Sequence, residues 1–129
     1  MKFAEDNLNE GYFITSYDTG KLMVNGKTIT TSLVIAPDQL IMDWSISDIS
    51  QLSTGHIEKI CRLKPELVLI GTGRQQCFPD IAIYAELIQS GIGVDIMDTA
   101  AACRTYNILN SEGRRVVAGL IQINDLPQT

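Results

Sequence analysis

Two short apolar segments, each followed at once by polar residues, constrain the fold of this 129-residue chain more than any other feature. Residues 67–70 precede the stretch Gly-Thr-Gly-Arg at 71–74, and residues 94–97 precede the pair Asp-Thr at 98–99. Short apolar runs with a helical segment between them are typical of buried parallel strands. Both polar motifs are then expected at the carboxyl ends of neighbouring strands, where open α/β sheets bind their ligands.

The first third of the chain reads as β structure. Asn25-Gly26 is its strongest hairpin signal, because both residues tolerate positive φ. The flanking segments 21–24 and 27–30 are predicted to pair across this turn. Further strands are predicted at residues 12–15, 33–35 and 39–44, which gives an antiparallel meander, with Trp44 in the core.

After Trp44 the pattern alternates between helix and strand. Helices are predicted from residues 53–54 to Pro65, from residues 78–80 to Gly91, and from residues 98–99 to about 109. Strands follow them at 67–70, 94–97 and 116–123. Residues 1–129 form one domain, mainly antiparallel β over 1–45 and α/β over 46–123, with a tail at 124–129.

Composition excludes several classes of function. The net charge of -5 argues against a nucleic-acid-binding surface. No apolar run approaches the roughly 20 residues that cross a bilayer, so no membrane insertion is expected. Residues 1–10 fit neither a signal nor a transit peptide, and the cytoplasm is the default location. All five arginines follow residue 60, where they either form a solvated, salt-bridged face or bind carboxylate or phosphate groups.

Three cysteines and one histidine give no metal or catalytic pattern. There is no Cys-x-x-Cys pair, and free thiols in a reducing compartment are the simplest account. Cys61 and Cys103 fall in helical patterns and are predicted core residues, whereas Cys77 lies in a loop and is the thiol to test for reactivity. His56 is predicted at the surface, and no Ser/His/Asp arrangement includes it. We therefore assign no catalytic residue, metal ligand or cofactor.

Residues 71–74 permit two interpretations. Glycines let backbone N–H groups approach a phosphate or carboxylate closely, and Arg74 could add a charge-assisted contact. The dinucleotide fingerprint is incomplete, because its third glycine would fall at Gln76. A sharp strand-to-loop turn that needs positive φ explains the same glycines without a ligand.

The second motif also permits two interpretations. Asp98 or Thr99 is suited to an ordinary N-cap, while the free N–H groups of a helix start form a ready anion site. Arg104 faces either the crevice or solvent, and Asn107 either contacts a ligand or satisfies backbone groups. The candidate ligand-binding residues are Gly71, Thr72, Gly73, Arg74, Asp98, Thr99, Arg104, Thr105 and Asn107.

Four stretches, at 65–73, 91–94, 97–109 and 112–116, resemble a known family. They are similar to the small domain of unknown function in mitochondrial complex I assembly factor 3, in the adipogenesis-associated domain-containing protein and in many short bacterial and archaeal proteins. The resemblance implies a three-layer α/β domain: a mixed central sheet with a parallel strand pair and flanking helices, plus an N-terminal antiparallel β meander. It implies no established enzymatic activity.

Two hypotheses of function follow. The first is a non-enzymatic interaction or assembly-accessory protein with protein partners, linked through the resemblance to biogenesis of the respiratory NADH dehydrogenase. The alternative is a small-molecule or anion-binding protein, or a weak enzyme, that takes a small anionic ligand in the crevice between the 71–73 loop and the helix start at 98–99. A homo-oligomer formed through an exposed β edge is compatible with either.

Overall fold

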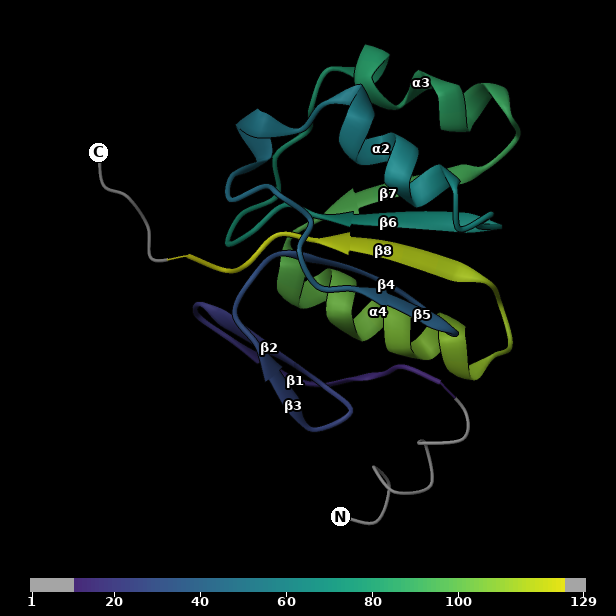
Figure 1. Ribbon diagram of the computed structural model, residues 1–129. Helices are drawn as coiled ribbons and strands as arrows, with labels where there is room; N and C mark the ends of the chain where they lie inside the picture. Colours follow the sequence, from purple (N-terminus) through teal and green to yellow (C-terminus); the bar gives the residue numbers. More distant parts are fainter. Residues whose placement is uncertain (1–10, 125–129) are drawn as a thin grey trace.

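The central element is a five-stranded mixed sheet covered on both faces (Figure 1). The computed structural model describes residues 11–124, so the predictions for residues 1–10 and for most of the tail lie outside the described part. The sheet has the order β5-β4-β8-β6-β7. Its strands are β4 (Leu33–Ala36), β5 (Gln39–Ile41), β6 (Leu67–Gly71), β7 (Gly93–Met97) and β8 (Val116–Leu120).

The strands predicted over residues 12–44 are present, but they divide between two sheets. β1 (Ile14–Asp18), β2 (Lys21–Val24) and β3 (Lys27–Ile29) form a separate antiparallel sheet, here called the meander. The hairpin turn between β2 and β3 is at Asn25 and Gly26, both with positive φ as the sequence predicts. β4 and β5 instead join the central sheet, where β4 pairs antiparallel with β8.

The two apolar runs form parallel strands, which confirms the fold class. β6 pairs in parallel with β7 on one side and with β8 on the other. The carboxyl ends of these three strands therefore meet at one end of the sheet. β6 and β8 are buried because their apolar residues are covered on both faces of the sheet.

The helices make the outer two layers. α2 (Thr54–Cys61) and α3 (Ile81–Gln89) lie on one face of the sheet, while α4 (Thr99–Ser111) lies on the other beside the meander (Figure 1). Two core clusters follow from this arrangement. One is built around Trp44 and Leu87 under α2 and α3, and the other around Tyr106 between α4, the sheet and the meander.

Element boundaries differ from the sequence prediction at several ends. α3 begins at Ile81 rather than at 78–80, because Asp80 is its N-cap and its side chain accepts the Ala82 N–H. β5 ends at Ile41 and β8 at Leu120. A short 3-10 helix, η2 (Ile49–Gln51), lies between β5 and α2.

Trp44 is fully buried, as predicted, and it contacts both His56 and Gly119. Its indole Nε1 donates to the carbonyl of His56, and the His56 ring meets it edge-on. His56 is partly exposed, and its ring nitrogens contact Ser53 and the Ser45 carbonyl at the surface. Trp44 also lies against Gly119 of β8, where a Cβ would come within 2.5 Å of the indole.

Gly119→Ala is expected to lower the free energy of unfolding by about 1–3 kcal/mol, because the buried indole has no room to move away. Gly93→Ala is the matched control, since a Cβ there meets only Leu67, at an ordinary 3.5 Å. Urea denaturation followed by tryptophan fluorescence measures both. Equal stability of the two variants would show that Trp44 does not constrain β8.

Candidate functional site

The crevice predicted between the two motifs is closed by the Thr99 side chain. Its hydroxyl accepts the Gly73 N–H at 2.8 Å and donates to the Ile121 carbonyl at 2.7 Å. The Thr99 N–H donates to the Gly73 carbonyl at 2.9 Å. Thr99 is fully buried, so one side chain joins the loop after β6, the start of α4 and the segment after β8.

The glycines of the first motif allow this close approach. A Cβ at Gly71 would lie 2.9 Å from the Thr99 hydroxyl, and Gly73 has a φ of +100°. Between them, the Thr72 N–H donates to the Met97 carbonyl. Thr72 is itself buried where the loop packs onto the end of β7, and the loop also lines a surface pocket.

The helix start of α4 is satisfied within the chain. Asp98 is the N-cap, and its carboxylate accepts the Ala101 N–H at 2.8 Å. The Thr99 N–H is taken by Gly73, and the Ala102 N–H by the Asp98 carbonyl. Three N–H groups at this helix start, those of Thr99, Ala101 and Ala102, therefore already have acceptors in this structure.

Further along α4, the candidate residues contact the meander. Arg104 donates to the Tyr17 hydroxyl at 2.7 Å and lies 5.9 Å from the centre of its ring. Asn107 accepts the Ile14 N–H and donates to the Ile14 carbonyl, as a neighbouring strand would. Thr105 is half-buried on the same helix. The side-chain hydrogen bonds of Arg104 and Asn107 are therefore with β1 and not with the 71–74 loop.

Arg74 lies on the other side of its loop, where a surface pocket opens. Its guanidinium donates to the Asn124 carbonyl and to the Thr19 hydroxyl. The pocket has a volume of about 340 Å³ and lies between Arg74, the segment around η2 and the residues after β8. A second pocket of about 470 Å³ shares Ser47, Gln122 and Asn124 with it.

Gln122 is a residue that the sequence prediction missed. It is 5% exposed, and its amide donates to the carbonyls of Ile29 and Thr31, which closes the seam between the meander and the sheet. Its Oε1 is buried without a hydrogen-bond partner in the structure. A lone glutamine after a strand carries no sequence signal for this role.

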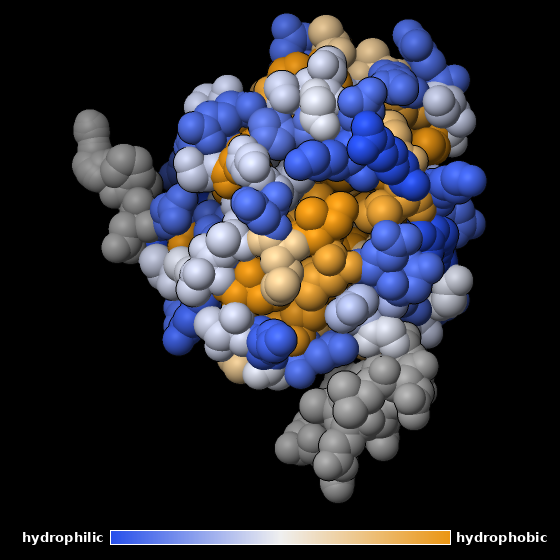
Figure 2. All heavy atoms as spheres, in the orientation of Figure 1, coloured by the Kyte–Doolittle hydropathy of each residue, from blue (hydrophilic) through white to orange (hydrophobic). Residues whose placement is uncertain are grey.

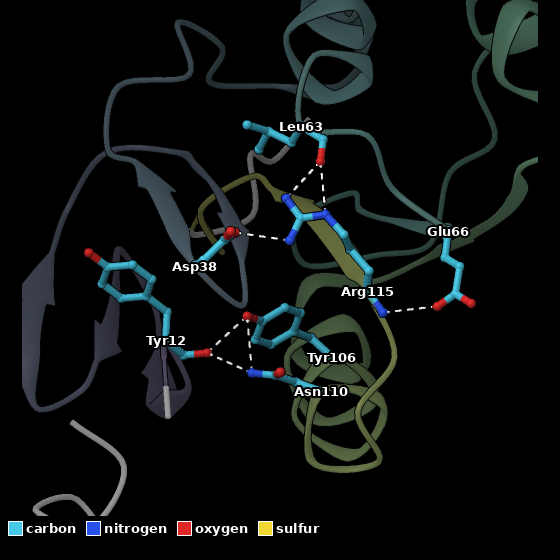
Figure 3. Close-up of polar contacts among 7 residues, drawn as sticks. All are labelled: Tyr12, Asp38, Leu63, Glu66, Tyr106, Asn110 and Arg115. Atoms are coloured by element: carbon cyan, nitrogen blue, oxygen red, sulfur yellow. Dashed lines mark hydrogen bonds and ion pairs between the residues drawn. The ribbon is translucent and has the colours of Figure 1, made fainter. Parts of the chain in front are cut away.

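The polar network at the opposite end of the sheet was also missed (Figure 3). Arg115 donates twice to the Leu63 carbonyl, at 2.7 and 3.0 Å, and forms an ion pair with Asp38. Nearby, the hydroxyl of Tyr106 and the amide of Asn110 both donate to the Tyr12 carbonyl. These contacts fasten α2, the β4–β5 turn and the start of the meander to the sheet, and they bind backbone groups rather than presenting a site.

The described residues offer no other centre of chemistry. Within residues 11–124, no group of three or more His, Cys, Asp or Glu side chains is arranged to hold a metal ion. In the same part of the chain, no helix is long and apolar enough to cross a membrane. Cys103 is buried, Cys61 is half-buried and Cys77 is exposed.

Large apolar side chains are exposed on α3 and just before it. Phe78 is 68% exposed, Ile81 60% and Ile88 47%, and Ala82 beside them is exposed too. In Figure 2 apolar atoms reach the surface at the top, where α3 lies, and also over the β5 edge in the middle of the view. At that edge Met42 is 50% exposed, whereas Leu40 and Ile41 are half-buried against the core.

A three-layer domain, with a central mixed sheet and a meander packed against one helix, defines a class of small α/β domains known from solved bacterial proteins. The structure is similar to a crystal structure from Bordetella parapertussis, with a TM-score of 0.83 and 34% identity over 88% of this chain and 97% of that one. A Bordetella pertussis solution structure described as an Mth938-like domain gives a TM-score of 0.79 at 28% identity, over 88% and 87% of the chains.

The chain belongs to the family described as protein of unknown function (DUF498/DUF598), whose model matches residues 14–121. It is 31% identical to the "13 kDa major membrane protein" of Francisella tularensis, over 90% of this chain and 95% of that protein. It is 32% identical to the zebrafish NADH dehydrogenase [ubiquinone] 1 alpha subcomplex assembly factor 3, over 94% and 70%. It spans 61% of the human factor. The family resemblance is confirmed.

Thr99→Val is expected to lower the free energy of unfolding by about 2–4 kcal/mol, because it leaves the Gly73 N–H and the Ile121 carbonyl buried and unpaired. Thr99→Ser keeps the hydroxyl and should cost only about 1 kcal/mol for the lost methyl group. Chemical denaturation of both variants makes the comparison. A larger loss in the serine variant would assign the role of Thr99 to packing instead.

The thiols should differ in reactivity in the folded protein. Burial raises the pKa of Cys61, and it raises the pKa of Cys103 to about 12, whereas the nucleophile is the thiolate. A chromogenic disulfide reagent at pH 8 should modify Cys77 first and Cys103 only after unfolding. Since the unfolded Cys103 thiol ionises near 9, stability should fall as the pH rises above about 9. Cys77→Ser should abolish the fast phase; a remaining fast phase would place a second thiol at the surface.

Proposed function

We propose that this chain is a protein-interaction module that assists the assembly of a larger complex and docks through the outer face of α3. The observation that carries the proposal is the exposure of Ile81 and Ile88 on α3 and of Phe78 just before the helix. Apart from Glu86 and Gln89 the residues of α3 are apolar, and a helix this apolar is ordinarily covered over much of its surface. In α3 only Leu87 is buried, so the helix has apolar surface for a partner to cover.

The energetics favour this use of the surface. Covering a fully exposed Ile or Phe side chain contributes about 1.5–3 kcal/mol, so three such anchors supply much of the free energy of a moderate interaction. Soluble monomers rarely keep contiguous apolar patches without a function. The α3 backbone is hydrogen-bonded within the helix, so the side chains alone would make the contact.

The relatives support the same class of function. The zebrafish relative is an assembly factor for an NADH dehydrogenase subcomplex. We extend this to the present chain as a role in biogenesis of a respiratory enzyme, carried out in the cytoplasm, where its free thiols would stay reduced.

The geometry supports binding of a small anion in the predicted crevice less well. A ligand between the 71–73 loop and the start of α4 would have to replace the contacts that Gly73 makes with Thr99. It would also compete with the Asp98 carboxylate for the helix N–H groups. Arg104 donates to the Tyr17 hydroxyl, and Arg74 donates to the Thr19 hydroxyl and the Asn124 carbonyl, so both guanidinium groups are already engaged within the chain. Docking through α3 requires no such rearrangement.

The test is complementation in the organism that carries the chain, with deletion of the gene and return of variants. The double variant Ile81→Ser/Ile88→Ser should fold normally and fail to restore assembly of NADH dehydrogenase, measured by native gel and activity. Ile108→Ser is the matched control, because Ile108 is 58% exposed on α4, on the other side of the sheet. It should restore assembly fully.

Two results would contradict the proposal. Full restoration by the α3 double variant would show that this face has no role in assembly. Normal assembly in the deletion strain would remove the link to the respiratory enzyme. Circular dichroism and thermal unfolding of the purified variants establish that any loss is not caused by unfolding.

A further inference from the structure

We propose that the α3 face binds an amphipathic helix of a partner protein whose apolar stripe is flanked by Lys or Arg, an inference that rests on the docking role proposed above. The observation behind it is the charge around the apolar side chains. Residues 75–103 contain no Lys, Arg or His, but they contain four acidic residues, Asp80, Glu86, Asp95 and Asp98.

Three of these carboxylates are exposed near the apolar face. Asp80 caps α3, Glu86 lies on α3 itself, and Asp95 lies on β7, which packs beside α3. Burial and then the negative charges of Glu86 and Glu58 raise the pKa of Cys61, which places both carboxylates near the α2–α3 contact. On α2, Lys59 and the exposed Arg62 offset Glu58, so the negative charge at this face comes from Asp80, α3 and β7.

The form of the surface selects a helix over a strand. β7 is the edge of the sheet, and strand addition would need its outward backbone groups. The Gln76 amide already donates to the Ile96 carbonyl at 2.9 Å, and the exposed Asp95 puts a charge on this edge. Ile81 and Ile88 lie on either side of the kink at Tyr84, and both are exposed apolar anchors for a partner helix.

The charge selects a basic partner over two other occupants. A second copy docked face to face would bring the carboxylates of Asp80 and Glu86 against their own equivalents. An anionic lipid surface would meet the same repulsion. A helix with flanking Lys or Arg side chains would pair with the carboxylates while its apolar stripe covers Phe78 and the two isoleucines.

The experiment uses two designed peptides of one length, a helical Leu/Lys peptide and its Leu/Glu counterpart, titrated into the intact chain. Isothermal titration calorimetry gives affinity, and two-dimensional NMR shows which amides shift. We expect the Leu/Lys peptide to bind and to shift amide signals centred on α3. Its affinity should fall as the salt concentration is raised from about 50 to 300 mM. The Leu/Glu peptide should not bind.

Matched variants separate this face from the general acidity of the protein. Ile81→Ser/Ile88→Ser should weaken binding of the Leu/Lys peptide at least about tenfold. Asp80→Asn/Glu86→Gln should weaken it about three- to tenfold and flatten the salt dependence. Ile108→Ser and Glu112→Gln change a comparable exposed isoleucine and carboxylate on and after α4, and they should leave affinity within about twofold.

The opposite outcomes overturn the inference. Equal binding of both peptides, or equal losses in the α4 controls, would show that the contact is not specific for this face and charge. Binding to vesicles of three parts phosphatidylcholine to one part phosphatidylglycerol, lost in the α3 variant, would assign the face to lipid. If the α3 variant fails to restore assembly but the Leu/Lys peptide does not bind the chain, the docking role of α3 is supported. The inference that its partner is a basic helix is then wrong. If the Leu/Lys peptide binds as expected while the α3 variant restores assembly, the proposed role in assembly is wrong. The inference about the basic helix is then retained.

Discussion

The hydroxyl of Thr99 is the contact on which the carboxyl end of the sheet depends. It connects the loop after β6 with the segment after β8, and its own backbone N–H returns to the same loop. Gly71 leaves room for this threonine, since a Cβ would lie against it. In many α/β sheets this end is open to ligand, but here it is occupied by the chain itself. A motif that looks like a binding site in the sequence therefore acts as an internal joint.

The polar residues further along α4 also form hydrogen bonds within the chain. Asn107 supplies both hydrogen bonds that a strand would offer to Ile14, and the hydroxyl of Tyr106 binds the Tyr12 carbonyl. The meander is thereby fixed to α4, and the two together cover one face of the sheet. These polar groups of α4 are used within the fold, whereas Thr72, Gly73 and Arg74 of the first motif line the surface pocket beside η2.

Local patterns made most of the architecture predictable. The apolar runs at 67–70 and 94–97, the turn at Asn25 and the N-cap at Asp98 all depend on neighbouring residues, and the structure contains each of them. The pairing of β4 with β8 joins residues more than eighty positions apart, and no local pattern encodes it. The closure of the crevice was equally hidden, because it depends on the direction of one threonine side chain. The contacts of His56 could not be predicted for the same reason, because they are made with Trp44 and Ser45, which lie outside its helix.

The two faces of the sheet explain why α3 is the element left for a partner. On one face α4 is backed by the meander, so its apolar residues have a second layer to contact. On the other face α2 and α3 form a single layer, and α3 is kinked at Tyr84, which limits how much of it packs downward. Leu87 enters the core, while Ile81 and Ile88 point away from it. The exposure of Ile81 and Ile88 on α3 adds nothing to the core of the isolated domain. It is explained if the single-layered face is completed by another protein, as the second face is completed by the chain's own meander.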